Sequence, residues 1–160
     1  DLTQGWNVNG NSYFTGNVGI GTSSPDVLLT LSETTNNTSI GFYNTGTNTA
    51  NRNWVIGSND QVFGDFAIMT SSSIGGNPIS AGVKRLYINP AGNVGIGTTS
   101  PTAKLHVAGG IQMADDTATA SADKVGTLKY RTSGNNSYVD MCMQTGAATY
   151  AWINIVQNNW

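Results

Sequence analysis

The chain has 160 residues, a formal net charge of −2 and only 10% charged residues. No apolar run reaches the roughly 20 residues of a membrane-spanning helix, and no basic cluster marks a nucleic-acid partner. One cysteine, Cys142, and one histidine, His106, exclude an intrachain disulfide and supply few ligands for a metal site. We therefore expect no cofactor, no membrane insertion and no nucleic-acid binding.

The composition favours extended structure with many tight turns. Gly, Asn, Thr and Ser dominate the polar residues, while good helix formers are scarce and Glu33 is the only glutamate. Four Trp, six Tyr and four Phe residues distinguish the chain from disordered sequences, which contain few aromatic residues. We predict an all-β fold. Because the sequence begins at Asp1 rather than at methionine, we also expect it to be a piece of a longer protein.

The first predicted element is a short unit that occurs twice. Residues 16–25 are GNVGIGTSSP and residues 92–101 are GNVGIGTTSP, so the copies differ only by Ser23 against Thr99. A short apolar strand follows each copy. Such similarity indicates one supersecondary structure used twice.

Alternation within the repeat predicts a strand with one apolar and one bare face. Val18 and Ile20 point to one side, and Gly19 and Gly21 to the other, where another backbone can approach closely. A unit this small cannot bury its apolar side chains alone, so we expect it to meet copies of itself around a symmetry axis. The residues predicted to form this core are Val18, Ile20, Val94, Ile96, Leu105 and Val107.

The stretch between the repeats predicts a small antiparallel sheet. Its short alternating segments are residues 39–44, 53–57, 63–70 and 83–89. Each places two large apolar side chains on one face, for example Ile40 with Phe42, and polar connections separate the segments. Residues 71–82 are predicted to form a flexible, exposed loop.

The last part of the chain predicts a linker and three strands. Residues 114–124 form the linker or at most one helical turn, and turns are expected at Asn135-Asn136 and Gly146. The expected strands cover residues 126–131, 137–143 and 150–156. The domain organisation that follows is 1–33 (first stalk repeat), 34–88 (small β domain), 89–124 (second stalk repeat and linker) and 125–160 (C-terminal β tip domain).

The repeated phrase GNVGIGT, followed by KLHV at residues 104–107, resembles the recurrent stalk element of bacteriophage tail fibres. The lead-in at residues 85–97 and the last three predicted strands are similar to parts of such fibres as well. The resemblance implies an elongated, intertwined homotrimer with β-stalk repeats and small β domains, joined to other fibre segments in an extracellular virion. Many such fibres mature through an endosialidase-type intramolecular chaperone, which would have followed Trp160 in the precursor.

The function implied by this resemblance is attachment of the virion to a host surface receptor, for which we expect a surface polysaccharide. Aromatic side chains can stack on sugar rings while polar side chains bind the hydroxyl groups. The first candidate set near the expected tip is Arg131, Asn135, Asn136, Tyr138, Thr149, Tyr150 and Trp152. A second candidate surface comprises Tyr43, Arg52 and Trp54. Individually, each aromatic residue is better explained by core or subunit packing.

Several alternatives stay open. The chain could be a purely structural fibre segment, a bacterial surface adhesin or a polysaccharide depolymerase. The last would need two carboxylates, for which Asp60 and Asp65 are the candidates, although a turn position for Asp60 and a solvent-facing position for Asp65 explain them better. We expect that the chain is not an enzyme. The GIGT phrases lack the remaining residues of a nucleotide-binding loop. A ring of His106 around a threefold axis is a weak candidate for a metal site.

Overall fold

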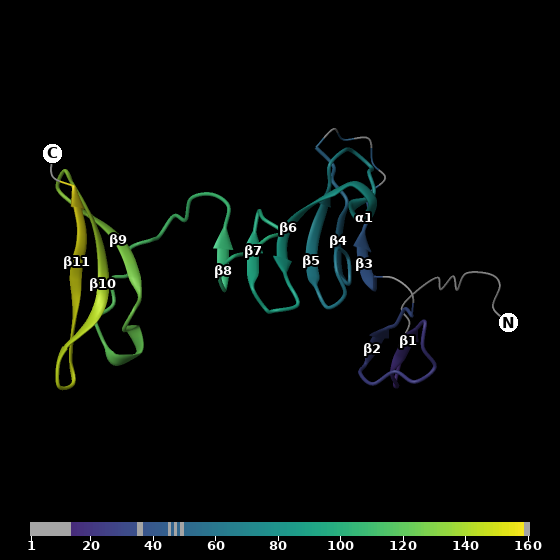
Figure 1. Cartoon of the computed structure of the whole chain (residues 1–160), viewed down its shortest axis with the longest axis horizontal. Coiled ribbons are helices and arrows are strands. Elements are labelled where there is room, and N and C mark those ends of the chain that lie inside the picture. The colour runs from purple at the N-terminus through teal and green to yellow at the C-terminus, as the bar shows by residue number, and fades with distance from the viewer. Residues whose placement is uncertain (1–13, 35–36, 45, 47, 49, 159–160) are drawn as a thin grey trace. The chain divides into compact units, whose positions relative to one another are not determined.

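The computed structural model consists largely of β-strands and describes residues 14–34, 37–44, 46, 48 and 50–158 (Figure 1). The predicted all-β fold is confirmed, because the helical turns in these ranges are short: α1 spans Pro78–Ala81 and the 3-10 turn η1 spans Ala122–Lys124. The chain divides into two compact units, Asp1–Gly109 and Gly110–Trp160, which are described separately. None of the helices in the described ranges is long and apolar enough to cross a membrane.

The two copies of the repeat have the same structure. Each consists of two short parallel strands: β1 (Val18–Ile20) with β2 (Leu29–Leu31), and β7 (Val94–Ile96) with β8 (Leu105–Val107). The Val18 N–H donates to the Leu28 carbonyl at 2.8 Å, and the Val94 N–H donates to the Lys104 carbonyl at 2.8 Å. The predicted sequence of strand, turn and second strand is therefore confirmed in both copies.

Glycines are required where the turn of the repeat folds back over its first strand. A Cβ atom on Gly19 would lie 2.3 Å from the carbonyl oxygen of Thr22, and one on Gly95 would lie 2.3 Å from that of Thr98. Gly97, two residues after Gly95, has a φ of +71°, a conformation that favours glycine. The bare face predicted for the repeat thus accommodates the chain's own backbone.

A six-stranded sheet forms the larger part of the first unit. Its strands follow the order β3 (Ser39–Phe42), β4 (Trp54–Ser58), β5 (Phe66–Ser71), β6 (Gly82–Ile88), β7 and β8. All neighbours are antiparallel except β7 and β8. The predicted antiparallel sheet is confirmed, and the second repeat extends it. Pairing of β6 with β7 crosses the boundary expected between residues 34–88 and 89–124.

Residues 71–82, predicted as a flexible loop, contain regular structure instead. The Asn77 side chain caps α1 by accepting a hydrogen bond from the Ile79 N–H at 2.9 Å. Pro78 occupies the first turn, where its missing N–H costs nothing, and it is buried. The helix contacts β4, β5 and β6, so this connection packs on the sheet.

The chain itself covers one face of the six-stranded sheet. Val55, Ala67, Met69 and Tyr87 on this face are at most 3% exposed and form the hydrophobic cluster of the first unit. This surface is termed the covered face.

The second unit contains a three-stranded antiparallel sheet of order β11–β10–β9. The strands are β9 (Leu128–Ser133), β10 (Asn136–Gly146) and β11 (Thr149–Asn158). The predicted linker, residues 114–124, is attached to this sheet by side chains. Trp152 Nε1 donates to the Ala118 carbonyl at 3.0 Å, and Lys129 Nζ donates to the Asp116 carbonyl at 2.9 Å. Within it, η1 is the one helical turn that the sequence allowed.

Candidate functional site

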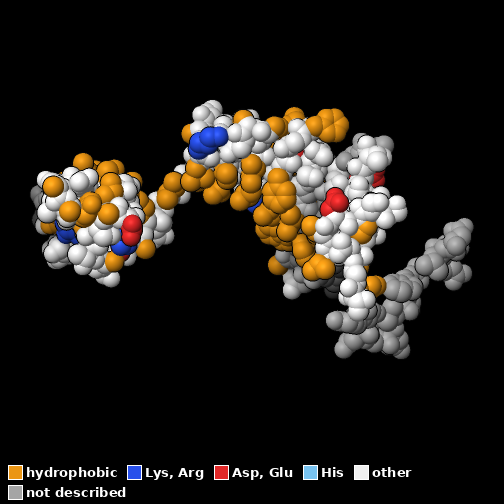
Figure 2. All heavy atoms as spheres, turned by 90° about the horizontal axis from the view of Figure 1, so that it is seen from below, with side chains coloured by type: hydrophobic (Ala, Val, Ile, Leu, Met, Phe, Trp, Pro, Cys, Tyr) orange, Lys and Arg blue, Asp and Glu red, His pale blue; other side chains and the backbone are white. Residues whose placement is uncertain are grey.

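Apolar side chains line the face of the six-stranded sheet opposite the covered face. Cross-strand register places Ile40, Ile56, Ile68, Leu86, Ile96 and Val107 in a middle row across all six strands. A row toward one strand end contains Ser58, Phe66, Ile88, Val94 and Leu105, and a row toward the other contains Phe42, Trp54, Thr70 and Val83. These three rows are termed the apolar face, and Figure 2 shows hydrophobic side chains gathered along the sheet.

The three rows of the apolar face contain no charged residue, and most of their members are open to solvent in a single chain, whereas Thr70 is buried. Ile40 is 44% exposed, Ile96 43% and Leu105 57%. Contiguous apolar patches of more than a few hundred Å² are rare on soluble monomers and mark association or ligand surfaces. The apolar face is therefore the main candidate for an interaction surface in this unit.

The predicted core residues of the second repeat, Val94, Ile96, Leu105 and Val107, all lie on the apolar face. In the first repeat, Val18 pairs with Leu29 and Ile20 pairs with Leu31. The side chain of Ile20 is 58% exposed. Their joint role as the core of a homotrimer stays a prediction.

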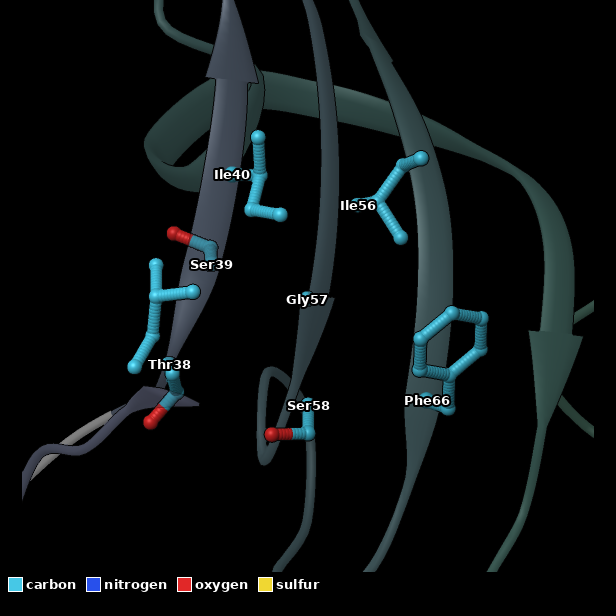
Figure 3. A pocket seen from close by; sticks show the side chains of 8 residues that line it. Thr38, Ser39, Ile40, Ile56, Gly57, Ser58 and Phe66 are labelled. Atoms are coloured by element: carbon cyan, nitrogen blue, oxygen red, sulfur yellow. The ribbon is translucent and has the colours of Figure 1, made fainter. Parts of the chain in front are cut away.

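A shallow hollow of about 340 Å³ opens at one end of the apolar face. Figure 3 shows Ile40 from β3, Ile56 from β4 and Phe66 from β5 around it, beside the small residues Gly57 and Ser58. Leu31 from the first repeat lines it as well. Because its walls are mainly apolar and contain no titratable group, the hollow can hold apolar side chains but offers no chemistry for catalysis.

The C-terminal sheet has a second open apolar surface. Register places its members on one face of β9, β10 and β11: Leu128, Tyr130, Val139, Met141, Met143, Ala151, Ile153 and Val156. Leu128 is 41% exposed and Val156 is 58% exposed. In each unit, the chain thus covers one face of its sheet and leaves an apolar face open to solvent.

Arg131 and Asp140 form the centre of the opposite, polar face of the C-terminal sheet. The Arg131 Nε donates to the Asp140 carboxylate at 2.5 Å, and its guanidinium stacks on the ring of Tyr138 with 3.9 Å to the ring centre. Burial of the 2% exposed Asp140 alone would raise its pKa, but Arg131 and Asn154 as hydrogen-bond donors lower the pKa below its ordinary value. Asn136 Nδ2 donates to the Tyr138 hydroxyl at 3.3 Å and completes this cluster.

Trp152 lies near the linker segment. Besides its bond to Ala118, its ring carries Lys129 Nζ at 4.4 Å from the ring centre. Lys129 also lies 3.7 Å from the Asp115 carboxylate. The ring of Trp152 is therefore already packed by its own chain, which leaves less of it for a ligand.

The structure does not bring the seven tip candidates together. Asn135 and Asn136 lie at the turn between β9 and β10, near Arg131 and Tyr138. In contrast, Thr149 begins β11 at the turn after β10, the other end of the sheet. Tyr150 and Trp152 follow Thr149 in β11. Four members of the first candidate surface still form one continuous site: Arg131, Asn135, Asn136 and Tyr138.

The second candidate surface is also divided. Trp54 lies on the apolar face, where it pairs with Phe42. Tyr43 lies against Gly41, whose register partner is the buried Val55, and its hydroxyl is 3.4 Å from Asn77 Oδ1. Tyr43 and Trp54 therefore lie on opposite sides of the sheet.

Arg52, the third member of that surface, is exposed and donates from Nη1 to the Asn51 carbonyl at 2.8 Å. This bond lies within its own loop and gives no indication of a shared site.

The candidate catalytic carboxylates have structural partners. Asp65 is 2% exposed and accepts the N–H groups of Asp60, Gln61 and Val62 at 2.8, 2.9 and 3.0 Å. Its burial raises the pKa, but these three donors and the Tyr87 hydroxyl lower the pKa below its usual range.

The Asp60 carboxylate forms an ion pair with Lys84 Nζ at 2.8 Å. A glycosidase needs one carboxylic acid with a raised pKa. The lowered pKa of Asp65 and the ion pair of Asp60 argue against that role, and the solvent-facing position considered for Asp65 is wrong.

His106 lies on the covered side of β8, opposite Leu105 and Val107, as alternation predicts. Its Nδ1 accepts the Thr102 N–H at 3.4 Å. Within the ranges that the structure describes, no group of three or more His, Cys, Asp or Glu side chains could hold a metal ion.

Sequence reasoning missed that the apolar rows of all six strands share one open face. It placed Ile40 with Phe42 and the corresponding pairs of the other strands correctly on one side of each strand. The small apolar residues Ala67 and Val55, on the alternate positions, were the signal that a second face exists and is buried.

We compared the chain with known proteins. No protein-family profile matches it. No curated protein matches it either.

Proposed function

We propose that this chain is a distal segment of a trimeric bacteriophage tail fibre that attaches the virion to a host surface glycan. The observation that carries the proposal is the open apolar face across six strands, together with the equivalent face of the C-terminal sheet. Burial contributes about 25 cal/mol per Å² of apolar surface, so burial of these faces between identical chains would stabilise their association. The tail-fibre resemblance of the repeats supports three parallel copies and a place in an extracellular virion.

The three rows run across the strands, and this arrangement suits parallel association of copies around an axis that is parallel to the rows. Rotation about such an axis leaves every residue at its own level, so Ile68 of one copy meets Ile68 of the others. Three attachment sites on one rigid fibre give avidity, so each site can be weak. The candidate site that supports attachment best is the group Arg131, Asn135, Asn136 and Tyr138, which is on the polar face and does not take part in the apolar rows.

Mass in solution tests the assembly. Light scattering should give about 50 kDa, three times the chain mass of 16.8 kDa. Ile96→Lys places a charge on the apolar face and should give monomers or unspecific aggregates. Ile74→Lys is the matched control, because Ile74 is 47% exposed, like the 43% exposed Ile96, but lies outside the rows. A compact monomer of the unchanged chain, or equal behaviour of both variants, refutes the proposed assembly.

Binding to glycans tests attachment. The trimer should bind at least one host surface polysaccharide on a glycan array, and Tyr138→Ala should reduce this binding at least tenfold without changing the mass. A trimer that binds no polysaccharide supports the second candidate, a structural fibre segment whose receptor site lies elsewhere. Reducing ends that appear on incubation with host polysaccharide, and disappear with Asp65→Asn, would support a depolymerase instead.

A further inference from the structure

The connection between β4 and β5, residues 59–65, is fixed in one shape by its own polar groups. The Asp65 carboxylate accepts three backbone N–H groups, the Asn59 side chain accepts the Gly64 N–H at 2.7 Å, and Lys84 holds Asp60. Gly64 has a φ of +88°. Several hydrogen bonds thus stabilise one conformation of this short surface loop.

Two apolar side chains lie at the apex of this rigid loop. Phe63 is 83% exposed, the largest fraction for any large apolar residue in the described ranges, and Val62 is 47% exposed. Neither belongs to a row of the apolar face, because both lie beyond the ends of β4 and β5. A preformed loop loses little entropy on binding, and exposed aromatic residues of this kind are typical anchors of interfaces.

A solvent-exposed aromatic pair lies on β3 and β4, at the strand ends away from the loop of residues 59–65. Phe42 and Trp54 are directly paired across the strands and are 56% and 42% exposed. They lie on the apolar face at the strand ends away from residues 59–65, since β4 runs from Trp54 to Ser58 before it enters that loop. The sheet therefore presents an exposed aromatic side chain, Phe63 (termed the knob), at one set of strand ends. It presents an exposed aromatic pair, Phe42 and Trp54 (termed the seat), at the opposite set of strand ends.

Closure of three sheets around an axis brings these two edges together. When three sheets face inward as the sides of a triangular prism, each corner joins one strand end of a sheet to the opposite strand end of the next. Rotation preserves the level along the axis. The knob, between β4 and β5, and Trp54, on β4, differ in level by less than one strand spacing of about 5 Å.

We propose that Phe63 of each copy packs on the Phe42–Trp54 pair of the next copy, so that the contact closes the ring of three. This inference rests on the proposed trimer and specifies how its corners are formed. The contact is heterologous, with different residues on the two partners, and such contacts close into rings when the rotation permits. The direction of the ring is fixed, because the knob of one copy always meets the seat of the next.

Thiol cross-linking of the full chain tests this arrangement. The double variant Phe63→Cys, Trp54→Cys, treated with a short bismaleimide, should give covalent trimers on a denaturing gel. Each single variant should stay uncross-linked, which also controls for the fully buried Cys142. A second control, Phe63→Cys with Leu105→Cys, joins two exposed positions at different levels and should give no trimers.

The outcomes separate the corner contact from the assembly. If the double variant is a trimer by mass but does not cross-link, the corner contact is refuted and the proposed trimer stands. If the unchanged chain is monomeric, both fail. Phe63→Ala should raise the concentration at which the trimer dissociates at least tenfold. If it leaves dissociation unchanged but abolishes glycan binding, the loop is a receptor contact and the inference is overturned.

Discussion

The carboxylate of Asp65 provides the sharpest test of how the loop is held. Asp65→Ala removes the acceptor of three backbone N–H groups, those of Asp60, Gln61 and Val62. Asp65→Asn keeps one acceptor oxygen but points an NH₂ group at a donor. The Asp65 Oδ2 accepts two of the three bonds, and Oδ1 accepts the third. If the amide oxygen of the asparagine takes the place of Oδ2, those two bonds remain, and only the bond from the Asp60 N–H is lost.

The magnitude follows from the solvent access of the three donors. Residues 61 and 62 are exposed, so water can replace the carboxylate and each bond contributes about 0.5–1 kcal/mol net. The N–H of the half-buried Asp60 is less accessible, and a bond to a charged acceptor there contributes about 1.5 kcal/mol. Summed over the three backbone donors, we expect Asp65→Ala to lower the free energy of unfolding by at least about 3 kcal/mol, since the Tyr87 hydroxyl also loses its acceptor, and Asp65→Asn by about 1.5 kcal/mol.

The assay is urea unfolding followed by circular dichroism, at one chain concentration because the stability of an oligomer depends on it. The pH dependence has a fixed sign. The pKa of Asp65 is lowered in the folded chain, so its stabilising contribution is complete above the unfolded pKa of about 3.9 and is lost as the pH falls through the folded pKa. The difference between the unchanged chain and Asp65→Asn should therefore shrink below about pH 4. An Asp65→Ala variant within about 0.5 kcal/mol of the unchanged chain refutes this reasoning.

Two further predictions concern the repeat and the C-terminal sheet. Gly95→Ala should lower the unfolding free energy by about 1–3 kcal/mol, since its Cβ would lie 2.3 Å from a backbone oxygen, whereas Gly16→Ala, with nothing within 4 Å, should change little in the same urea assay. Equal midpoints for the two variants would contradict the fold-back of the turn. Arg131→Met leaves the buried Asp140 without its main donor, so the variant should unfold at lower urea at pH 7. Because the pKa of Asp140 is lowered when folded, this difference should decrease as the pH falls below about 4, the ordinary range of an aspartate; a constant difference would show that packing on Tyr138, not the ion pair, is what Arg131 contributes.

The sequence alone determined the local structure of this protein. The repeat predicted its strand, turn and strand, because Gly95 permits the close approach of the turn and Gly97 permits the positive φ, and both needs are local to the repeat. Alternation predicted which side chains of each strand share a side, including Ile40 with Phe42, since the pleat of a strand has a period of two. Low charge and dense turn residues predicted the all-β class for the same local reasons.

Only the tertiary structure decided which face each sheet leaves open and which candidates meet. The addition of β7 to β6 and the order of the six strands depend on contacts between residues far apart in the chain, which no local pattern specifies. The burial of Val55 and Ala67 on the covered face also depends on such contacts. Without it, the apolar rows could not be distinguished from the ordinary buried core of the sheet. The seven tip candidates separated because antiparallel strands place consecutive turns at opposite ends of a sheet, so neighbours in sequence order, such as Asn136 and Thr149, are not neighbours in space.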